Sequence, residues 1–408
     1  MTEQGSTYKW WILTMVCLAN FFVIGLSWMS IPVMFVEMIT KNGWPLPALL
    51  FAWGLIPLAV VFLNLPAGIM GDKFGIQWVA GLGMIAAGIT GAARGMSTSV
   101  DMFQVSMFLY GASFPFAFIL MPKALGMYFP LQDLGKANGY AQGAYGAGAA
   151  LALMLSGTVI SPALGGWQNT CYLWGVVSII LGILWLVTVK DKPAEAAAAA
   201  GPPVSVTATL LGLLKNPMIQ MLCLIYFLFL GGWVGASGAY PALAVKGRGL
   251  SATAANNVVA VALWLYVVGA FIIPGISDRM GLRRPVYCIG LLISGIGMFL
   301  TFLFPAPQVW IWACMWGITA GTIPIIFAMP FEMKEVGPAL GGTAMALIFV
   351  AGNLGGFIFP ALTAYIAKTM DPTASMLWIG VLCGLIGYAL TGLLIWGVRE
   401  TGHKAQAQ

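Results

Sequence analysis

Long apolar runs dominate the chain and predict helices that cross a bilayer. A spanning helix needs about 20 mostly apolar residues, because backbone N–H and C=O groups left unpaired in lipid are costly. Twelve runs reach this length. They cover roughly Trp10–Val36, Leu46–Met70, Trp78–Met96, Met102–Tyr128, Leu134–Ser161, Trp167–Val189, Met218–Val245, Ala252–Ile276, Pro285–Phe304, Gln308–Phe331, Pro338–Ala367 and Ser375–Val398. The pattern predicts an all-α membrane protein with twelve transmembrane helices.

The second half of the chain repeats the first. A constant separation of 206 positions joins four pairs of landmarks, which are Asp72 and Asp278, Gly75 and Gly281, Gly135 and Gly341, and Gly146 and Gly352. One offset across several landmarks indicates an internal duplication. The stretch 190–216 is rich in Ala and Pro and cannot bury a core, so it reads as a cytoplasmic linker. We therefore expect two pseudo-symmetric six-helix bundles, 1–189 and 217–408, the second ending in a short cytoplasmic tail.

A short polar motif ends the second apolar run of each half. Its residues are Gly68, Asp72, Lys73 and Gly75 in the first copy, and Asp278, Arg279, Gly281 and Arg283 in the second. In a tight turn, glycine allows close approach, the carboxylate can cap a helix start, and the basic residue can bridge to a neighbour. The motif resembles the Gly-x-x-x-Asp-Arg-x-Gly-Arg-Arg signature of the major facilitator superfamily, although Ile76, Gln77 and Pro274 depart from it.

The resemblance covers the whole chain and implies what these residues do. Members of that family are secondary transporters that work by alternating access, and their motif acts as a conformational gate. The resemblance also implies a monomer that binds a small-molecule substrate within the lipid bilayer. The motif identifies the fold and leaves the transported solute open.

The composition fits a membrane protein whose charge follows its topology. Hydrophobic residues make up 60% of the chain, charged residues 7%, and the mean hydropathy is +0.94. Cytoplasmic loops retain Lys and Arg, and with both termini inside the cell most basic residues fall on the inner side. The outer side then holds only Lys41, Arg94, Lys246, Arg248 and Lys368. The net charge of +6 is thus explained by orientation in a cell (inner or plasma) membrane, and no nucleic-acid binding is inferred from it.

Residues for catalysis or metal binding are scarce. The single histidine, His403, lies in the polar tail, and the six cysteines fall inside apolar runs without metal-like spacing. Serines and cysteines have no base nearby in the sequence. The chain therefore predicts no metal, no cofactor and no enzyme activity, with a membrane-embedded enzyme as the rival class.

Candidate substrate residues are one lysine and several uncharged polar or aromatic side chains. Ionisable residues inside a membrane are functional candidates, and Lys123 lies in the fourth run near its cytoplasmic end. It can attract an anion, or it can extend to water in a structural role. The uncharged candidates are Asn20, Trp28, Gln142, Tyr145, Tyr226, Trp233, Tyr240 and Asn353. Helix packing is the competing explanation for each of them.

Three local resemblances bear on the solute. Gly25–Phe35 is similar to the first helix of monocarboxylate and oxalate–formate carriers, and Ala351–Gly356 to the signature of nitrate and nitrite porters. Asn64 and Ala270, however, occupy the positions of the anion-binding arginines of those porters. Gly157–Gly166 resembles a motif of drug–proton antiporters. A small organic anion is the leading prediction, with lipophilic drugs or cations and inorganic anions as alternatives.

The mode of coupling stays open. No carboxylate lies near the middle of a run, so a coupling proton has no clear carrier. Facilitated diffusion, exchange, and symport with a proton carried on a weak-acid substrate are all compatible with the sequence.

Overall fold

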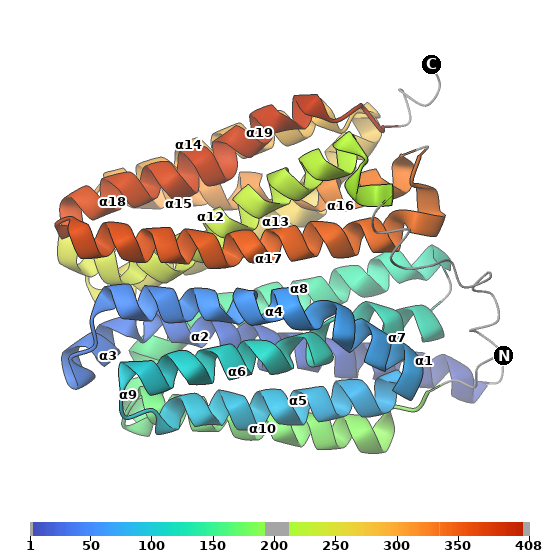
Figure 1. The fold of residues 1–408 in the computed structure, drawn as a ribbon, viewed down its shortest axis with the longest axis horizontal. Coiled ribbons are helices and arrows are strands. Elements are labelled where there is room, and N and C mark those ends of the chain that lie inside the picture. The colour runs from blue at the N-terminus through green and yellow to red at the C-terminus, as the bar shows by residue number, and fades with distance from the viewer. Residues whose placement is uncertain (1–2, 130, 192–211, 334, 403–408) are drawn as a thin grey trace. The chain divides into compact units, whose positions relative to one another are not determined.

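The computed structural model describes residues 3–129, 131–191, 212–333 and 335–402, which form helices joined by short turns (Figure 1). Twelve helical segments are long and apolar enough to cross a membrane. No strand occurs among the described residues. The predicted all-α fold with twelve spans is therefore confirmed. Most of the predicted linker 190–216, and also His403, fall outside the described residues.

The helices cluster into two compact units. The first comprises Met1–Pro45 and Leu58–Gly201, and the second comprises Leu46–Pro57 and Pro202–Gln408. The division expected from the sequence assigned the whole second span to the first bundle, whereas residues 46–57 pack with the second unit. Trp53 accounts for this, because its indole Nε1 donates to the Val234 carbonyl at 2.9 Å and its ring lies against Gly238.

The first unit contains one short and five long helical spans, several of them interrupted. Its helices are α1 (Glu3–Leu18), η1 (Ala19–Leu26), α2 (Ser27–Val33), α3 (Phe35–Asn42), the later part of α4 (Leu46–Phe74), α5 (Ile76–Ala93), η2 (Arg94–Met96), α6 (Val100–Phe118), α7 (Leu120–Tyr128), α8 (Leu131–Leu155), η3 (Ser156–Ile160), α9 (Ser161–Leu164) and α10 (Trp167–Thr188). The element η1 is a π-helix in the middle of the first span.

Among the described residues of the second unit, four spans are single helices, whereas the fourth and the sixth are interrupted. The helices of this unit are α12 (Pro217–Arg248), α13 (Ala252–Met280), α14 (Arg284–Leu303), α15 (Val309–Ala320), α16 (Pro324–Glu332), α17 (Gly337–Thr369), α18 (Pro372–Gly380), η5 (Val381–Ala389), α19 (Leu390–Leu394) and η6 (Ile395–Gly397). The start of α4 belongs to this unit as well.

Polar caps and glycines set where the spans begin and end. Ser99 and Ser251 each accept a backbone N–H three residues later, which caps the starts of α6 and α13. Gly249 ends α12 with a φ of 66°, a left-handed conformation that glycine adopts without steric cost. These local signals are why the observed ends lie close to the predicted ones.

Glycines let neighbouring helices approach closely within each unit. In the first unit α5 and α10 run side by side (Figure 1), and a Cβ added to Gly88 would lie 2.6 Å from the Gly175 carbonyl oxygen. In the second unit α12 and α17 pack together, and a Cβ added to Gly355 would lie 1.9 Å from the Phe227 carbonyl oxygen. Larger residues at either glycine would push the helices apart.

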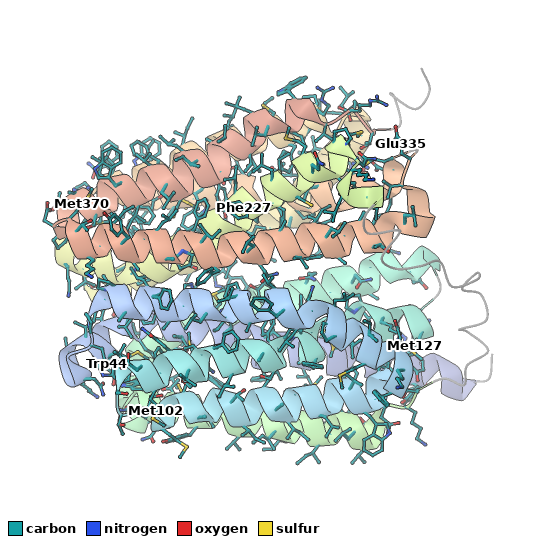
Figure 2. All side chains as sticks on the ribbon, in the orientation of Figure 1. Trp44, Met102, Met127, Phe227, Glu335 and Met370 are labelled. Carbon is teal, nitrogen blue, oxygen red and sulfur yellow. The ribbon has the colours of Figure 1, made fainter. Side chains whose placement is uncertain are left out.

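Each unit has two ends, and the polar motif lies at one of them. In the first unit Trp44 and Met102 lie at one end and Met127 at the other (Figure 2). Lys123, one helical turn before Met127, binds Asp72 of the motif. In the second unit Glu335 lies at the end opposite Met370 (Figure 2) and pairs with Arg399 of the tail. We call the end that carries Gly75 or Gly281 the motif end.

Candidate functional site

A buried arginine lies inside the first unit. Arg94 follows the last turn of α5, and its side chain has no exposed surface. Its Nε donates to the Gly91 carbonyl at 3.0 Å, and its Nη2 donates to the carbonyl and the hydroxyl of Ser27 at 3.1 and 2.9 Å. The guanidinium carbon lies 4.0 Å from the centroid of the Tyr110 ring. Arg94 therefore joins α5, α2 and α6.

The arginine points into the membrane-spanning part of the unit. Side chains on a helix lean toward its amino terminus, so a residue at the end of α5 reaches back along the bundle. Tyr110 lies about 15 Å along α6 from its start at Val100, at 1.5 Å per residue. Gly91 leaves room for this course, because a Cβ there would lie 3.3 Å from Arg94 Nη2. The charge is thus held within the span.

No carboxylate neutralises this charge in the described part of the chain. Arg94 is the only charged side chain among the described residues that is buried, and no ion pair includes it. Its Nη1 is buried and has no hydrogen-bond partner among the described residues. Arginine stays protonated in proteins, and a buried unpaired charge is costly. Carbonyls and the Tyr110 ring offset part of that cost and leave a net positive charge.

The sequence pattern assigns Arg94 to the outer side of the membrane and gives no sign of its burial. The apolar run ends at Met96, and an arginine at the end of a run is normally exposed to water. The available signal was Gly91, three residues earlier, because a glycine at that spacing removes the side chain that would block an inward course.

The structure places Asn20 at the middle of the first span. This span runs from Thr7 to Val33, and Asn20 lies in the π-helix η1. Its Nδ2 donates to the Ala141 carbonyl of α8 at 3.0 Å, whereas its Oδ1 is buried without a hydrogen-bond partner among the described residues. Single π-turns inside helices often mark functional positions. Asn20 therefore offers an unused acceptor deep in the first unit.

The other candidates of the first unit lie around the same two spans. Trp28 packs edge to face on Phe114, with ring centroids 5.3 Å apart. Gln142 is exposed and follows the residue that binds Asn20, whereas Tyr145 is half-buried. Glycines at this crossing bring α8 close to η1, so Gln142 and Tyr145 lie near the first span.

The candidates of the second unit are mostly aromatic packing residues. Tyr226 forms an aromatic cluster with Phe229, Phe327 and Phe349, and its ring fits against Gly352. Asn353, the next residue on α17, donates to the carbonyl of Phe349 at 2.9 Å. The structure therefore brings Tyr226 and Asn353 into one region.

Two further candidates lie elsewhere on α12. Trp233 contacts Trp316 at a centroid distance of 5.9 Å. Tyr240 is fully buried and packs edge to face on Phe302. Its hydroxyl is buried without a hydrogen-bond partner among the described residues.

At the motif end of the first unit, Lys123 is already paired. Its Nζ lies 2.5 Å from Asp72 Oδ1 and also donates to the Gly71 carbonyl at 3.1 Å. Asp72 and Lys73 lie in the last turn of α4, and Gly75 forms the turn with a φ of 84°. Gly68 has open space around its Cα, so no close approach requires glycine there.

The motif carboxylate does not cap the next helix, as the sequence suggested it could. Asp191, which follows the last span of the first unit, accepts the backbone N–H groups of Ile76 and Gln77 instead. In the second unit Glu400 takes the same role and accepts the N–H groups of Arg283 and Arg284. Each unit thus ties the chain after its sixth span to the start of its third. Sequence alone could not pair residues so far apart.

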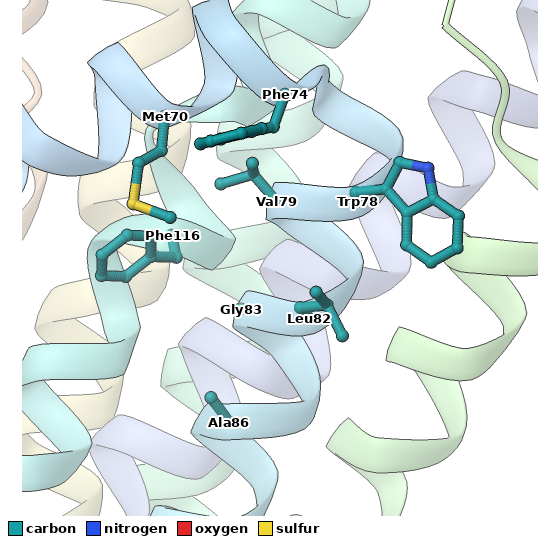
Figure 3. Close-up of a pocket in the computed structure, with 8 residues that line it drawn as sticks. All are labelled: Met70, Phe74, Trp78, Val79, Leu82, Gly83, Ala86 and Phe116. Atoms are coloured by element: carbon teal, nitrogen blue, oxygen red, sulfur yellow. The ribbon is translucent and has the colours of Figure 1, made fainter.

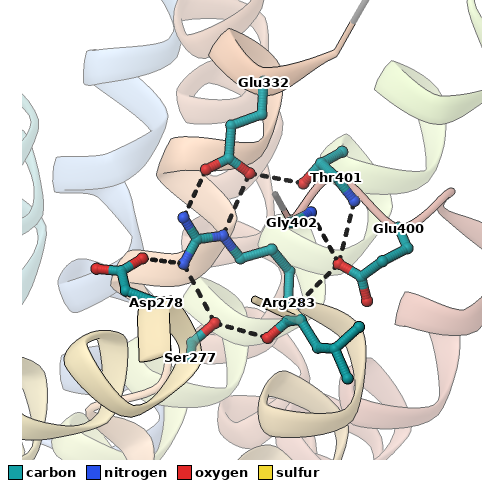
Figure 4. A network of polar contacts seen from close by, with 8 residues as sticks. Ser277, Asp278, Arg283, Glu332, Glu400, Thr401 and Gly402 are labelled. Atoms are coloured by element: carbon teal, nitrogen blue, oxygen red, sulfur yellow. Dashed lines mark hydrogen bonds and ion pairs between the residues drawn. The ribbon is translucent and has the colours of Figure 1, made fainter. Parts of the chain in front are cut away.

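A network of charged side chains surrounds Arg283 at the motif end of the second unit (Figure 4). Arg283 donates to both carboxylate oxygens of Glu332, to Asp278 and to the Ser277 hydroxyl. Thr401 of the tail also donates to Glu332. Hydrogen bonds to Glu332 and then to Asp278 outweigh burial and raise the pKa of Arg283 above its ordinary value.

The remaining motif residues of the second unit shape the turn. Gly281 ends α13 with a φ of 69°. Arg279 lies in the last turn of that helix and is exposed.

Glu400 makes the tail sensitive to acid. Burial acts to raise the pKa of its carboxyl, but four backbone N–H donors outweigh burial and lower the pKa below the ordinary 4.5. Unfolding therefore takes up a proton. The stabilisation is complete above about pH 4.5 and is lost as the pH falls through the folded value. We expect Glu400→Gln to reduce the fall in melting temperature between pH 6 and pH 4, with Asp371→Asn as the control.

These observations agree with the comparison to known proteins. A family model described as "Major Facilitator Superfamily" matches residues 16–360 and 222–408. The chain belongs to the major facilitator superfamily. It is therefore an integral, multi-pass membrane protein that transports a small solute and is not an enzyme. Among the described residues, no group of three His, Cys, Asp or Glu side chains is placed to hold a metal ion.

Curated relatives of this superfamily member are also transporters. The inner membrane transport protein RhmT of Escherichia coli is 25% identical over 381 residues, which cover 86% of this chain and 85% of RhmT. A putative tartrate transporter of Agrobacterium vitis is 24% identical over 84% of this chain and 80% of its own length. A chloroplastic ascorbate transporter of Arabidopsis thaliana is 22% identical over 97% and 75%.

Solved structures show the same fold. A bacterial homolog of the human lysosomal transporter Spinster, in an inward-facing and unoccupied conformation, superposes with a TM-score of 0.76. It is 14% identical and covers 96% of this chain and 97% of its own. At this identity the likeness concerns the fold of the superfamily and not the solute.

Proposed function

We propose that this superfamily member carries a small organic anion, a carboxylate, across the membrane by alternating access. The buried, unneutralised charge of Arg94 carries this proposal. At an effective dielectric constant of about 20, a single negative charge about 6 Å from a guanidinium is stabilised by about 3 kcal/mol. A cation at the same place is disfavoured by a similar amount. The sign of the buried charge therefore selects anions.

The names of several relatives support the same class of solute. The relatives include a putative tartrate transporter, an ascorbate transporter and a probable anion transporter. Tartrate is a carboxylate, whereas ascorbate is a small organic anion whose charge lies on an enolate oxygen, so the two names together support an organic anion. Arg94 supplies the charge that such a solute needs, while Asn20 and the aromatic candidates supply uncharged contacts.

Lys123, the cationic candidate from the sequence, is not proposed as the anion-binding residue. Its ammonium is paired with Asp72 and lies toward the motif end, so it contributes little net charge to the spans. We propose that the Lys123–Asp72 pair and the Arg283 network act in the gate, together with the turns at Gly75 and Gly281. Gln142, Tyr145, Tyr226, Trp233, Tyr240 and Asn353 remain proposed substrate contacts.

We also propose that the protein lies in the inner membrane of the cell. Its motif ends and both termini then face the cytoplasm. The distribution of Lys and Arg supports that orientation. The printed name of RhmT supports the inner membrane.

The alternative is an exporter of lipophilic drugs. A tetracenomycin C resistance and export protein of Streptomyces glaucescens is 31% identical, but over only 149 residues, or 35% of this chain. Arg94 argues against cationic drugs. An inorganic anion such as nitrate would be attracted by the same charge, so only a binding experiment distinguishes it from a carboxylate.

A ligand panel on the purified protein tests the proposal. The melting temperature in detergent is followed with oxalate, tartrate, ascorbate, nitrate and tetraphenylphosphonium. A ligand of the folded state at about 100 times its Kd adds about 2.7 kcal/mol, which is a measurable shift. We expect a carboxylate to give the largest shift. A shift with nitrate alone, or with tetraphenylphosphonium alone, would overturn the carboxylate assignment.

Lys123→Gln is expected to leave carboxylate affinity within about threefold of the wild type. The pair with Asp72 is partly exposed, and exposed pairs contribute about 0–1 kcal/mol to stability. Titration of the melting temperature against a carboxylate measures the affinity, and the melting temperature without ligand measures the stability. If the variant loses the carboxylate response while staying folded, Lys123 and not Arg94 is the anion-binding group.

A further inference from the structure

An apolar groove runs along the outside of the first unit near its motif end (Figure 3). It has a volume of about 560 Å³ and is lined by Met70 and Phe74 of α4, by Trp78, Leu82 and Ala86 of α5, and by Phe116 of α6. At its floor α5 touches α6, because a Cβ on Gly83 would lie 2.6 Å from the Phe116 carbonyl carbon. The small side chain of Ala86 leaves the inner part of the groove open.

The groove runs in the direction of a lipid tail and is long enough for part of one. It follows α5 from Trp78 to Ala86, about 12 Å at 1.5 Å per residue, from the start of the span toward its middle. Trp78 and Leu82 are 56% and 53% exposed, so their side chains meet hydrocarbon. A tryptophan at the start of a span is typical of the membrane interface. An acyl chain that enters at Trp78 would therefore lie parallel to its neighbours in the bilayer.

A positive charge lies at the interfacial end of the groove. Lys73 is exposed, and its Nζ lies 5.2 Å from the centroid of the Phe74 ring, which lines the groove. No carboxylate of the described residues lies within ion-pair distance of Lys73, and the adjacent Asp72 is paired with Lys123. An ammonium at the interface attracts anionic lipid head groups by about 1 kcal/mol per charge. Lys73 is thus available to a phosphate.

We propose that this groove is a binding site for one anionic glycerophospholipid. One acyl chain occupies the groove between Phe74, Leu82, Ala86 and Phe116, and Lys73 binds the phosphate. The site is separate from the solute path and does not depend on the identity of the solute. Because it joins α4, α5 and α6 beside the Gly75 turn, a bound lipid stabilises the motif end of the first unit.

Two pairs of matched variants distinguish a specific lipid-binding site from ordinary contact with the bilayer. Ala86→Phe fills the groove, whereas Ile89→Phe places the same ring on an exposed position of α5 beyond it. Lys73→Gln removes the proposed phosphate ligand, whereas Lys9→Gln removes another lysine that lies over aromatic rings. If Ala86→Phe does not fold, Ala86→Leu replaces it. The melting temperature without lipid shows whether each variant is folded.

The measurement is native mass spectrometry of the detergent-purified protein with added dioleoylphosphatidylglycerol. The wild type, Ile89→Phe and Lys9→Gln are expected to retain one lipid, while Ala86→Phe and Lys73→Gln retain it at least fivefold less. Dioleoylglycerol, which lacks the phosphate, is expected to compete poorly. Equal retention by all variants would overturn the proposal, and so would equal retention of dioleoylglycerol and dioleoylphosphatidylglycerol by the wild type.

Discussion

Replacing Arg94 by glutamine is expected to lower the affinity for a small carboxylate about a hundredfold. The change removes the buried charge of the first unit but keeps a side chain that can bond Ser27. A loss of about 3 kcal/mol of attraction corresponds to about two orders of magnitude in Kd. The affinity is measured by titration of the melting temperature or by isothermal calorimetry. Arg94→Gln is also expected to stay folded, because it removes a buried charge that lacks a carboxylate partner.

Arg94→Lys is the matched control for that experiment. Lysine keeps the charge but loses the planar fork that bonds Gly91 and Ser27 at the same time. We expect a loss of about tenfold, between wild type and Arg94→Gln. Equal losses in the two variants would show that the hydrogen bonds of Arg94, and not its charge, determine binding.

Glu332→Ala is expected to lower the melting temperature by several degrees, more than Asp278→Ala, which removes the other carboxylate bound to Arg283. Arg283 is only 13% exposed and donates to both oxygens of Glu332. Removing Glu332 takes away two hydrogen bonds of the largely buried guanidinium and leaves it only the exposed Asp278 as a charged partner, at a cost of about 2–4 kcal/mol. Differential scanning fluorimetry of the purified protein measures this loss.

Asp278→Ala provides the comparison on the same arginine. Asp278 is 63% exposed, so water replaces most of its contact, and a loss of less than about 1 kcal/mol is expected. A double variant, Arg283→Met with Glu332→Leu, removes both charges together and should recover much of the stability lost in Glu332→Ala. If Asp278→Ala costs as much as Glu332→Ala, the motif carboxylate and not Glu332 holds Arg283.

The fold followed from the sequence because its main determinants are local. A run of about 20 apolar residues specifies a span wherever it occurs, and Ser99, Ser251 and Gly249 mark helix ends through neighbouring atoms. The internal duplication led us to expect that the helices are grouped into two halves. The exception is residues 46–57 of α4, because their packing is set by Trp53 and its partner Val234, far away in the sequence.

The site was harder to predict because it depends on side-chain direction and distant pairing. Lys123 was identified as an intramembrane charge, but its neutralisation by Asp72 appears only when α4 and α7 are brought together. For Arg94 the reverse holds. Its position in the sequence suggested an exposed residue on the outer side, but its side chain points into the helix bundle and is buried. The caps supplied by Asp191 and Glu400 likewise join residues more than 100 positions apart.

Uptake of a labelled carboxylate into proteoliposomes tests whether the protein transports carboxylates and whether Arg94 is required. Vesicles containing wild-type protein, Arg94→Gln or Lys123→Gln are compared with empty vesicles, using labelled oxalate and tartrate and an excess of unlabelled nitrate as competitor. We expect saturable uptake of at least one carboxylate by the wild type and by Lys123→Gln, and almost none by Arg94→Gln. Undiminished uptake by Arg94→Gln, or no saturable uptake of either carboxylate by the wild type, would contradict the proposal.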